Sequence, residues 1–359
     1  RTVVAGNGLD ADSHEFRITP YNTALITIYN AVPHDLSSVG GPTNGYVIEG
    51  VVQELDIESG KVLFEWHSLD HVALDESYNP LPPSPTTVNT AWDYFHINAV
   101  TLDTDGNLII SARHTWTVYK LDHQTGDVIW RLGGKKSDFT LGTGVAFAWQ
   151  HNPIAVDSHT IRIFDNESNG TPVLPYSRVI WVNHNDRTKT ATLARWFKHP
   201  DGLSAPSQGD SQGLNDGDTF VGWGALGRFS EFDSQGNLLF DANVPPGYDT
   251  YRAYRFTWEG DPSDEPTATA QQGSGGTIVH AIWNGATQVA TWDVLDASGG
   301  QGRRSLPGFG GGQKQLAATP WNGLDTTITV PGTPTSIIVV AKDHFGHELG
   351  RSPVTAVAQ

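Results

Sequence analysis

The segment TVYKLDHQTGDVIWRL (117–132) decides the fold class. An apolar strand leads into Asp122, a glycine-containing turn follows, and a second strand carries a tryptophan. Alternating runs on both sides of a glycine turn are typical of a β-hairpin. The same unit recurs at 51–66 (VVQELDIESGKVLFEW) and at 227–242 (GRFSEFDSQGNLLFDA), with a degenerate copy at 178–197 (RVIWVNHNDRTKTATLARWF). The first part of the chain is therefore built on a repeated hairpin.

The spacing of this repeat predicts a β-propeller. Its copies are separated by 66, 64 and 47 residues when aligned on the turn residues Asp56, Asp122, Asp186 and Asp233. Such spacing suits one four-stranded sheet per repeat. A second shared unit precedes each outer hairpin and predicts an inner hairpin, with copies near His14, His96, His151 and Gln212. Because the innermost strand of each blade lines the central channel, we expect these positions to converge on one axis.

Composition predicts an all-β chain with two domains. The 39 glycines, 21 prolines, 12 tryptophans, 10 tyrosines and 14 phenylalanines favour short strands and tight turns. We expect residues 1–259 to form four blades of a β-propeller, which N-terminal blades on another segment or on a second chain complete. Residues 260–276, rich in Pro, Ser, Thr and Gly, predict a linker. The alternating runs of 277–359 predict a small Ig-like β-sandwich for packing or surface attachment.

Charge and composition also exclude several partners. A formal net charge of −17 argues against nucleic acid and against an anionic membrane surface. No apolar run is long enough to predict a membrane span. The absence of cysteine rules out disulfides and thiolate metal sites. The sequons at Asn166 and Asn169 favour a secreted protein, N-glycosylated there if a eukaryote makes it, and the start at Arg1 indicates a processed or truncated product.

Three histidines of the inner hairpins, His14, His96 and His151, are the candidate catalytic residues. Asn98 lies two residues after His96 and is expected on the same side of its strand. Arg113 ends the paired strand and is expected at the same rim of the channel. Histidine can act as acid, base or nucleophile near neutral pH, and arginine matches tetrahedral oxyanions and carboxylates. The set predicts transfer or elimination on an anionic substrate; the alternative is that these histidines only tie blades together.

Several neighbouring features have competing interpretations. The aromatic residues near the inner strands either form a wall for a phenol or sugar ring or pack between blades: Trp92, Tyr94, Trp149 and Trp223. His114 follows Arg113 and is expected to face away from the site if the strand is regular. Three imidazoles could hold zinc, but no carboxylate partner is evident beside them, so we predict no metal. Hydrolysis by two carboxylates is disfavoured, because no Asp or Glu recurs in phase.

The chain also resembles a known family, the arylsulfotransferase-like propeller proteins. The motifs that carry the resemblance are WDYFHINAV (92–100), LIISARH (108–114), TVYKLDHQTGDVIWRLGG (117–134), AWQHNP (148–153), IRIFDN (161–166) and FVGWGALGRFSEFD (220–233). They span most of residues 1–258. The resemblance implies a six-bladed propeller, with about two blades before Arg1. It also implies transfer of a sulfuryl group between phenols through a transiently sulfated histidine, without a nucleotide cofactor.

Carried over by motif, the resemblance implies a role for each candidate. His151 is the nucleophile, His96, Asn98 and Arg113 bind the sulfuryl oxygens and assist the leaving phenolate, and His14 is a further channel histidine. Arg228 and Ser230 are candidates for one remaining polar position. Three hypotheses follow: a secreted aryl-sulfate sulfotransferase, a polysaccharide lyase or other enzyme acting on an anionic glycan with the same His and Arg groups, and a non-catalytic glycan- or protein-binding propeller.

Overall fold

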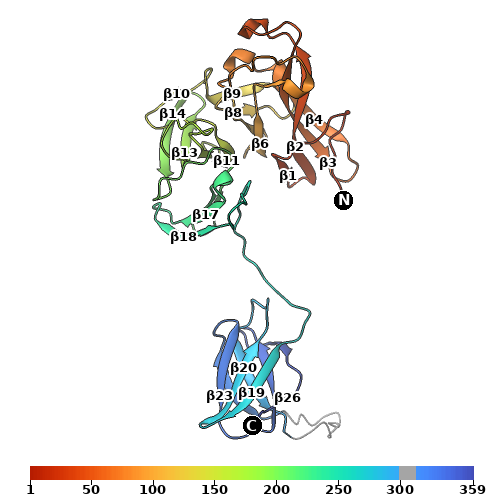
Figure 1. Cartoon of the computed structure of the whole chain (residues 1–359), viewed down its shortest axis with the longest axis vertical. Coiled ribbons are helices and arrows are strands. Elements are labelled where there is room, and N and C mark those ends of the chain that lie inside the picture. Colours follow the sequence, from red (N-terminus) through yellow and green to blue (C-terminus); the bar gives the residue numbers. More distant parts are fainter. Residues whose placement is uncertain (299–312) are drawn as a thin grey trace. The chain divides into compact units, whose positions relative to one another are not determined.

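The computed structural model describes residues 1–298 and 313–359, which form two compact units, Arg1–Arg255 and Phe256–Gln359 (Figure 1). Strands dominate both units, and the helical elements among the described residues are 3-10 turns of three residues: η1 (Ser37–Val39), η2 (Ser68–Asp70), η3 (Leu74–Glu76), η4 (Val88–Thr90) and η5 (Gly224–Leu226). The predicted all-β fold class is confirmed. Within the described ranges, no helix has the length and hydropathy needed to cross a membrane.

The first unit, which is described throughout, consists of four sheets whose strands follow one another in antiparallel order (Figure 1). The first two are β1 (Phe16–Ile18), β2 (Thr23–His34), β3 (Gly45–Asp56), β4 (Val62–His67) and β6 (Ile97–Leu102), β7 (Leu108–Ala112), β8 (Thr117–Leu121), β9 (Val128–Gly133). The others are β11 (His151–Asp157), β12 (Thr160–Asp165), β13 (Arg178–Asn185), β14 (Thr190–Phe197) and β15 (Asp210–Gly213), β16 (Thr219–Gly222), β17 (Arg228–Phe232), β18 (Leu238–Asn243). Two short parallel strands, β5 (Trp92–Asp93) and β10 (Thr140–Leu141), extend the first and third sheets.

Consecutive sheets pack through apolar layers, as neighbouring propeller blades do. Leu25 and Val52 of the first sheet share a core with Ile110 and Tyr119 of the second. The next layer joins Ile109, Trp130, Ile161 and Ile180, and the last joins Phe164, Trp181, Trp223 and Phe232. Burial of large aliphatic and aromatic side chains stabilises this arrangement. The number of blades in a complete ring stays a prediction.

The repeated outer hairpins owe their turns to one acceptor side chain. Asp56, Asp122 and Asp233 each accept backbone N–H groups of the turn that follows, as short polar side chains do in tight turns. In the degenerate copy this position is Asn185, whose Oδ1 accepts from two turn N–H groups, and not the aligned Asp186. The repeat therefore reflects a local requirement of the turn.

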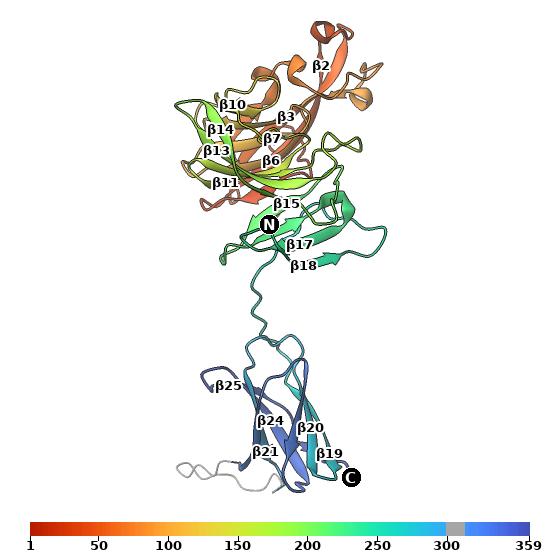
Figure 2. The ribbon, with the colours of Figure 1, turned by 90° about the vertical axis from the view of Figure 1, so that its left-hand side faces the viewer.

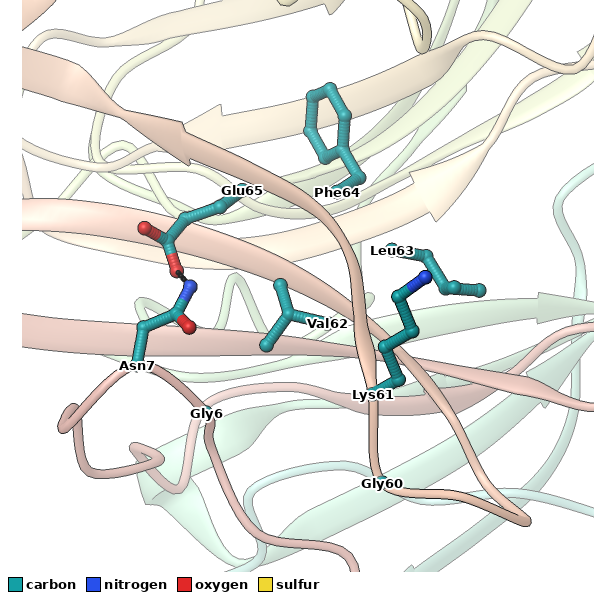
Figure 3. Close-up of a pocket in the computed structure, with 8 residues that line it drawn as sticks. All are labelled: Gly6, Asn7, Gly60, Lys61, Val62, Leu63, Phe64 and Glu65. Carbon is teal, nitrogen blue, oxygen red and sulfur yellow. Dashed lines mark hydrogen bonds between the residues drawn. The ribbon is translucent and has the colours of Figure 1, made fainter.

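Residues 1–10 lie outside any strand and cover part of the first sheet. Val3, Ala5 and Leu9 pack on an apolar cluster that includes Ile26 and Val51. Beside them is an open pocket of about 500 Å³, in which the Asn7 side chain donates to Glu65 at 2.8 Å (Figure 3). This pocket is lined by residues 6–7 and 60–65 and includes none of the candidate histidines.

The second unit contains two sheets that share one core (Figure 2). One sheet is β19 (Thr267–Gly273), β20 (Gly276–Ile282), β23 (Asp325–Val330); the other is β22 (Gln315–Pro320), β21 (Thr291–Asp296), β24 (Ser336–Lys342), β25 (Glu348–Arg351), with β26 (Thr355–Ala356) on β24. Val279, Trp292, Ile328 and Val339 meet between them. The predicted linker, 260–276, is too long, because β19 occupies its second half. The Ig-like assignment stays a prediction.

Candidate functional site

The histidines of the first three inner hairpins lie in one cluster of rings. The His14 and His96 rings are 5.1 Å apart, and Tyr29 stacks on His14 at 5.1 Å. His151 joins through Tyr251, whose ring lies 6.4 Å from His151 and 5.6 Å from His14. The structure therefore brings together side chains from the starts of separate sheets, as expected for inner positions of a propeller.

Each of the three histidines is held at Nδ1 by an oxygen acceptor. His14 is 2.7 Å from Asp12 Oδ1, His96 is 2.5 Å from Asp93 Oδ2, and His151 is 2.7 Å from Asn166 Oδ1. A carboxylate or amide oxygen can only accept, so Nδ1 carries the proton in each pair. Two acceptors are charged and one is neutral, which gives the three imidazoles different chemistry.

His151 is held as a neutral imidazole. The Nδ2 of Asn166 donates to the carbonyl oxygens of Ala205 and Gln208, which orients its Oδ1 towards His151 Nδ1. Burial, followed by the charge of Arg113, lowers the pKa of His151 well below its ordinary value. The lone pair on Nε2 accepts from the Gln208 backbone N–H at 3.2 Å. This nitrogen is the nucleophilic atom of the ring.

Asp93 and His96 form a half-buried carboxylate–imidazole pair. Burial lowers the pKa of His96, and Asp93 opposes this effect. Burial also raises the pKa of Asp93, but the hydrogen bond and charge of His96 outweigh it, so this pKa is lowered. Asp93 therefore stays ionised and can stabilise a proton on His96. The expectation that no carboxylate lies beside the histidines was wrong, since Asp12 and Asp93 both do.

His114, which we expected to face away, belongs to the cluster. Its ring lies 4.4 Å from that of His96, and its Nδ1 donates to the backbone oxygen of Asp93 at 2.6 Å. Strand β7 ends at Ala112, so the alternation assumed for 113 and 114 does not apply. Burial lowers the pKa of His114 to about 4, and the ring is neutral at physiological pH.

Arg113 supplies the positive charge of the site. Its Nη2 donates to Pro206 O at 2.9 Å, its Nη1 lies 3.1 Å from His114 Nε2, and its guanidinium lies 5.0 Å from the Trp149 ring centre. The buried Nε has no hydrogen-bond partner in the described part of the chain. A half-buried cation next to the neutral His114 and His151 suits a tetrahedral oxyanion.

A segment after the fourth sheet completes the cluster. Arg252 forms two hydrogen bonds with Glu15, at 2.7 and 2.9 Å, beside His14. Both side chains are buried, so the pair is strong and geometrically specific. The same segment bonds to the fourth sheet, where Asp210 Oδ1 accepts from Ala253 N–H. Tyr251 and Arg252 were not predicted as site residues from the sequence, because their segment matches no repeat unit.

The remaining candidates mostly have structural contacts. Asn98 is fully buried and donates to Gln150 O at 2.8 Å, which fixes the loop before His151. A bulge between Ile97 and Ala99 interrupts the alternation that would have placed Asn98 beside His96. Trp149 meets both Arg113 and His114. The others lie in blade-packing cores or in a separate polar cluster around Asp241: Trp92, Tyr94, Trp223, Arg228 and Ser230.

Backbone strain is concentrated here. Left-handed φ angles are rare for bulky residues, yet they occur at His96 (54°), Trp116 (51°), Trp149 (58°) and Gln208 (61°). Each costs on the order of 1–3 kcal/mol unless the surroundings impose it, and such residues gather at functional sites. The packing of neighbouring sheets therefore fixes loops that would otherwise relax.

The structure also gives the surroundings of the possible metal ligands and of the two predicted glycosylation sites. Among the described residues, Asp93, His96 and His114 present ligand atoms within 4.8 Å of one another. Arg113 at His114 Nε2 opposes a further cation at that atom. Asn166 is fully buried and both its amide atoms are bonded, whereas Asn169 is exposed, so the folded chain favours Asn169 of the two predicted glycosylation sites; glycosylation itself stays a prediction.

Comparison with known protein families assigns the chain to a family. The arylsulfotransferase (ASST) family profile matches residues 9–244, which include the ring cluster up to Gln208. The chain belongs to this family. The activity that this membership supports is arylsulfotransferase-like in general terms. No curated protein sequence matches the chain.

Solved structures align along much of the chain at low similarity. They include BamB from Moraxella catarrhalis (13% identity, 86% of this chain and 72% of that one, TM-score 0.29). The periplasmic gluconolactonase PpgL of Pseudomonas aeruginosa aligns at 12% identity over 96% and 85% of the two chains, with a TM-score of 0.36. Catalytically inactive virginiamycin B lyase of Staphylococcus aureus aligns at 8% over 98% and 96%, also at 0.36.

Proposed function

We propose that this protein transfers a sulfuryl group between phenols through His151. The observation that carries the proposal is the neutral, buried His151, whose Nδ1 is held by an amide and whose Nε2 keeps its lone pair. A carboxylate at Nδ1 would favour the imidazolium, which cannot attack. Family membership supports the same chemistry.

In the first half-reaction, Nε2 of His151 attacks the sulfur of an aryl sulfate. The N–S bond forms as the bond from sulfur to the aryl oxygen breaks, and the phenolate leaves with the electron pair. The entering group displaces the Gln208 N–H from Nε2, so that this N–H can donate to a sulfuryl oxygen. Arg113 lies close enough to lower the pKa of His151, so its positive charge can stabilise the sulfuryl oxygens.

His96 handles the proton. When protonated, it gives its proton from Nε2 to the leaving phenolate; in the second half-reaction it takes the proton of the acceptor phenol, whose oxygen attacks sulfur while the N–S bond breaks. Asp93 accepts from Nδ1 and stabilises the charged ring. The arriving sulfate monoanion favours protonated His96, against the effect of burial.

The direct experiment is mass spectrometry of the protein and its peptides after incubation with 4-nitrophenyl sulfate. We expect released nitrophenol and a sulfuryl adduct on His151. Both should disappear in His151→Asn, while Ser230→Ala, a change outside the histidine cluster, should keep them. An adduct on another residue, or turnover that persists in His151→Asn, would refute the histidine intermediate.

Assays on the same protein sample distinguish the sulfotransferase from the lyase and from the non-catalytic binding protein. A binding propeller has no need of desolvated, precisely held histidines, so the burial of His151 favours an enzyme. A lyase would form an unsaturated product from an anionic glycan, which ultraviolet absorbance detects, without any sulfuryl adduct. Absence of both products would favour the binding hypothesis.

We further propose that this protein is secreted and that additional blades complete its propeller. Apolar side chains of the first and fourth sheets are exposed: Phe16 (56%), Ile18 (64%), Leu239 (57%) and Phe240 (48%). Phe16 and Ile18 share one face of β1, and a further sheet packed on this face and on one face of β18 would cover the apolar side chains that point towards it. A longer chain, or a second chain added in solution, should reduce binding of a hydrophobic dye to these faces; unchanged binding would contradict the proposal.

A further inference from the structure

Three charged residues at one end of the third sheet take no part in the transfer steps proposed above. Asp165, Glu167 and Arg178 are buried, with exposed fractions of 0, 3 and 6%. Arg178 Nε donates to Asp165 Oδ2 at 2.8 Å. Its Nη2 donates to Glu167 Oε1 at 3.1 Å and to the backbone oxygen of Ala146 at 2.6 Å. One guanidinium thus joins two carboxyl groups, and we call these three residues the charged triad.

The charged triad holds the loop that leads from β10 to His151. Asp165 Oδ1 accepts the backbone N–H of Ala148 at 3.1 Å. The backbone N–H of Glu167 donates to the backbone oxygen of Ala148 at 2.9 Å. Both bonds come from the end of β12, so this loop is fixed to the third sheet three residues before His151.

The triad also surrounds Asn166, the residue that orients the His151 ring. Asn166 lies between Asp165 and Glu167 in the chain, and its Oδ1 accepts from His151 Nδ1 at 2.7 Å. Glu167 has a left-handed φ of 53°, which turns the backbone directly after Asn166. A shift of the triad would therefore move both partners of this hydrogen bond, the acceptor through the end of β12 and the donor through the loop.

Stability alone does not account for these buried charges. The attraction between buried charges often only balances the free energy needed to remove them from water, and apolar residues that fill the same space can be equally stable. Apolar residues, however, offer no directed donors or acceptors for the loop backbone. A planar guanidinium donates in fixed directions, which is the property that a positioning group needs.

We propose that Arg178 is a positioning residue for His151, because through Asp165 it fixes the loop before His151 and the Asn166 side chain. With this support, the His151 ring keeps its proton on Nδ1 and its lone pair on Nε2. The effect of Arg178 on sulfuryl transfer rests on the function proposed above; its effect on the His151 ring does not.

Nuclear magnetic resonance of the histidine ring N–H groups tests the inference on the full chain. The buried Nδ1–H of His151 should exchange slowly with water and give a signal that is missing in His151→Asn. Arg178→Lys keeps the charge but lacks the planar fork. Asp165→Asn has one oxygen in place of two, so either Ala148 N–H or Arg178 Nε faces an NH₂ group. Each variant should make the exchange about tenfold faster or abolish the signal.

Two further variants should keep this signal. Glu167→Gln retains an oxygen that accepts from Arg178. Burial, followed by the charge of Asp165, raises the pKa of Glu167, so a neutral amide replaces a group whose neutral form is already favoured. Arg195→Lys is the matched control, since Arg195 lies on β14 of the same sheet and donates to Asp233 O instead.

Transfer assays give a second readout. With 4-nitrophenyl sulfate, Arg178→Lys should lower kcat by about tenfold or more with little change in KM, because a small displacement of a reacting atom slows the chemical step. Arg195→Lys should keep kcat near the wild-type value. A loss confined to KM would argue against positioning.

The outcomes separate the two proposals. Loss of the signal in Arg178→Lys and Asp165→Asn supports positioning, even if no sulfuryl adduct forms in the wild type. An intact signal in both variants would overturn it while leaving an adduct on His151 as separate support for transfer. A wild type without the slow signal, or an equal loss in Arg195→Lys, would also overturn it. Should Arg178→Lys fail to fold, Asp165→Asn decides alone.

Discussion

His151 donates its Nδ1 proton to the side-chain oxygen of Asn166, a neutral amide, at 2.7 Å. The two other predicted histidines have aspartates in the same position. An amide orients an imidazole without favouring its protonation, whereas a carboxylate does both. In the proposed mechanism, this difference separates the nucleophile, His151, from the histidine that transfers the proton, His96.

Asn166→Asp should therefore favour protonation of His151. The new charge raises its pKa, by about one unit or more for an opposite charge at this distance. We expect the acid limb of the pH profile of kcat/KM for 4-nitrophenyl sulfate to move upward by a similar amount. Asn169→Asp adds the same charge at an exposed position and should leave the limb in place. An unmoved limb in Asn166→Asp would contradict the assignment of His151.

Asp93→Asn tests a positioning residue through leaving-group dependence. Without the carboxylate, His96 binds a proton less readily and assists poor leaving groups less. General acid–base assistance is worth roughly 10²–10⁴-fold, so phenyl sulfate turnover should fall by about 100-fold, but turnover of 4-nitrophenyl sulfate by much less. Equal losses for both donors would indicate a purely structural role for Asp93.

The buried pair of Glu15 and Arg252 should contribute to the stability of the first unit. Loss of Arg252 leaves the buried Glu15 carboxylate with only the longer contact to Arg17, at 3.7 Å, so Arg252→Gln is expected to lower the free energy of unfolding by about 3 kcal/mol. The double variant with Glu15→Gln should recover part of this loss. Urea titration of both variants measures the coupling, and additive losses would argue against a direct interaction.

His114 should make the folded chain less stable in mild acid. His114 has a pKa of about 4 in the folded chain, against an ordinary value near 6.5, so the unfolded state binds its proton first. The contribution is full above about pH 6.5 and is lost as the pH falls towards 4. His114→Gln should reduce the loss between pH 6.5 and pH 5 by about 2 kcal/mol, as urea titrations at both values would show. Identical losses in both proteins would contradict a neutral, buried His114.

Expression through a eukaryotic secretory pathway should place a glycan on Asn169 alone. Asn166 has no free amide atom, while Asn169 is exposed. Glycopeptide mapping distinguishes the two sequons, with Asn169→Gln as control. A glycan on Asn166 would mean that modification precedes folding.

The equivalent positions of His14, His96 and His151 in the repeated inner hairpin were enough to predict that their side chains lie close together. Periodicity works there because each residue stands at the same point of a repeated unit. It failed for His114, since β7 ends two residues earlier and a turn sets its direction. The aspartates were visible as Asp12 two residues before His14 and Asp93 three before His96, but no repeat marks them.

Tyr251 and Arg252 lay beyond sequence reasoning for a different reason. Their segment has no regular strand, and its place depends on contacts with Glu15 and Asp210, which are distant in sequence. The positions of the aromatic candidates also depend on packing. Trp92 and Trp223 pack in the hydrophobic cores between sheets, whereas the Trp149 ring contacts Arg113. Composition alone does not distinguish these environments.

The contact between Glu15 and Arg252 also has a consequence for biosynthesis. It joins residues 237 positions apart, so a nascent chain that has emerged only as far as the third sheet holds the three histidines but lacks Tyr251 and Arg252. The ring cluster is then open on one side until nearly the whole first unit has left the ribosome. Completion of the site thus waits for residues that emerge long after its histidines.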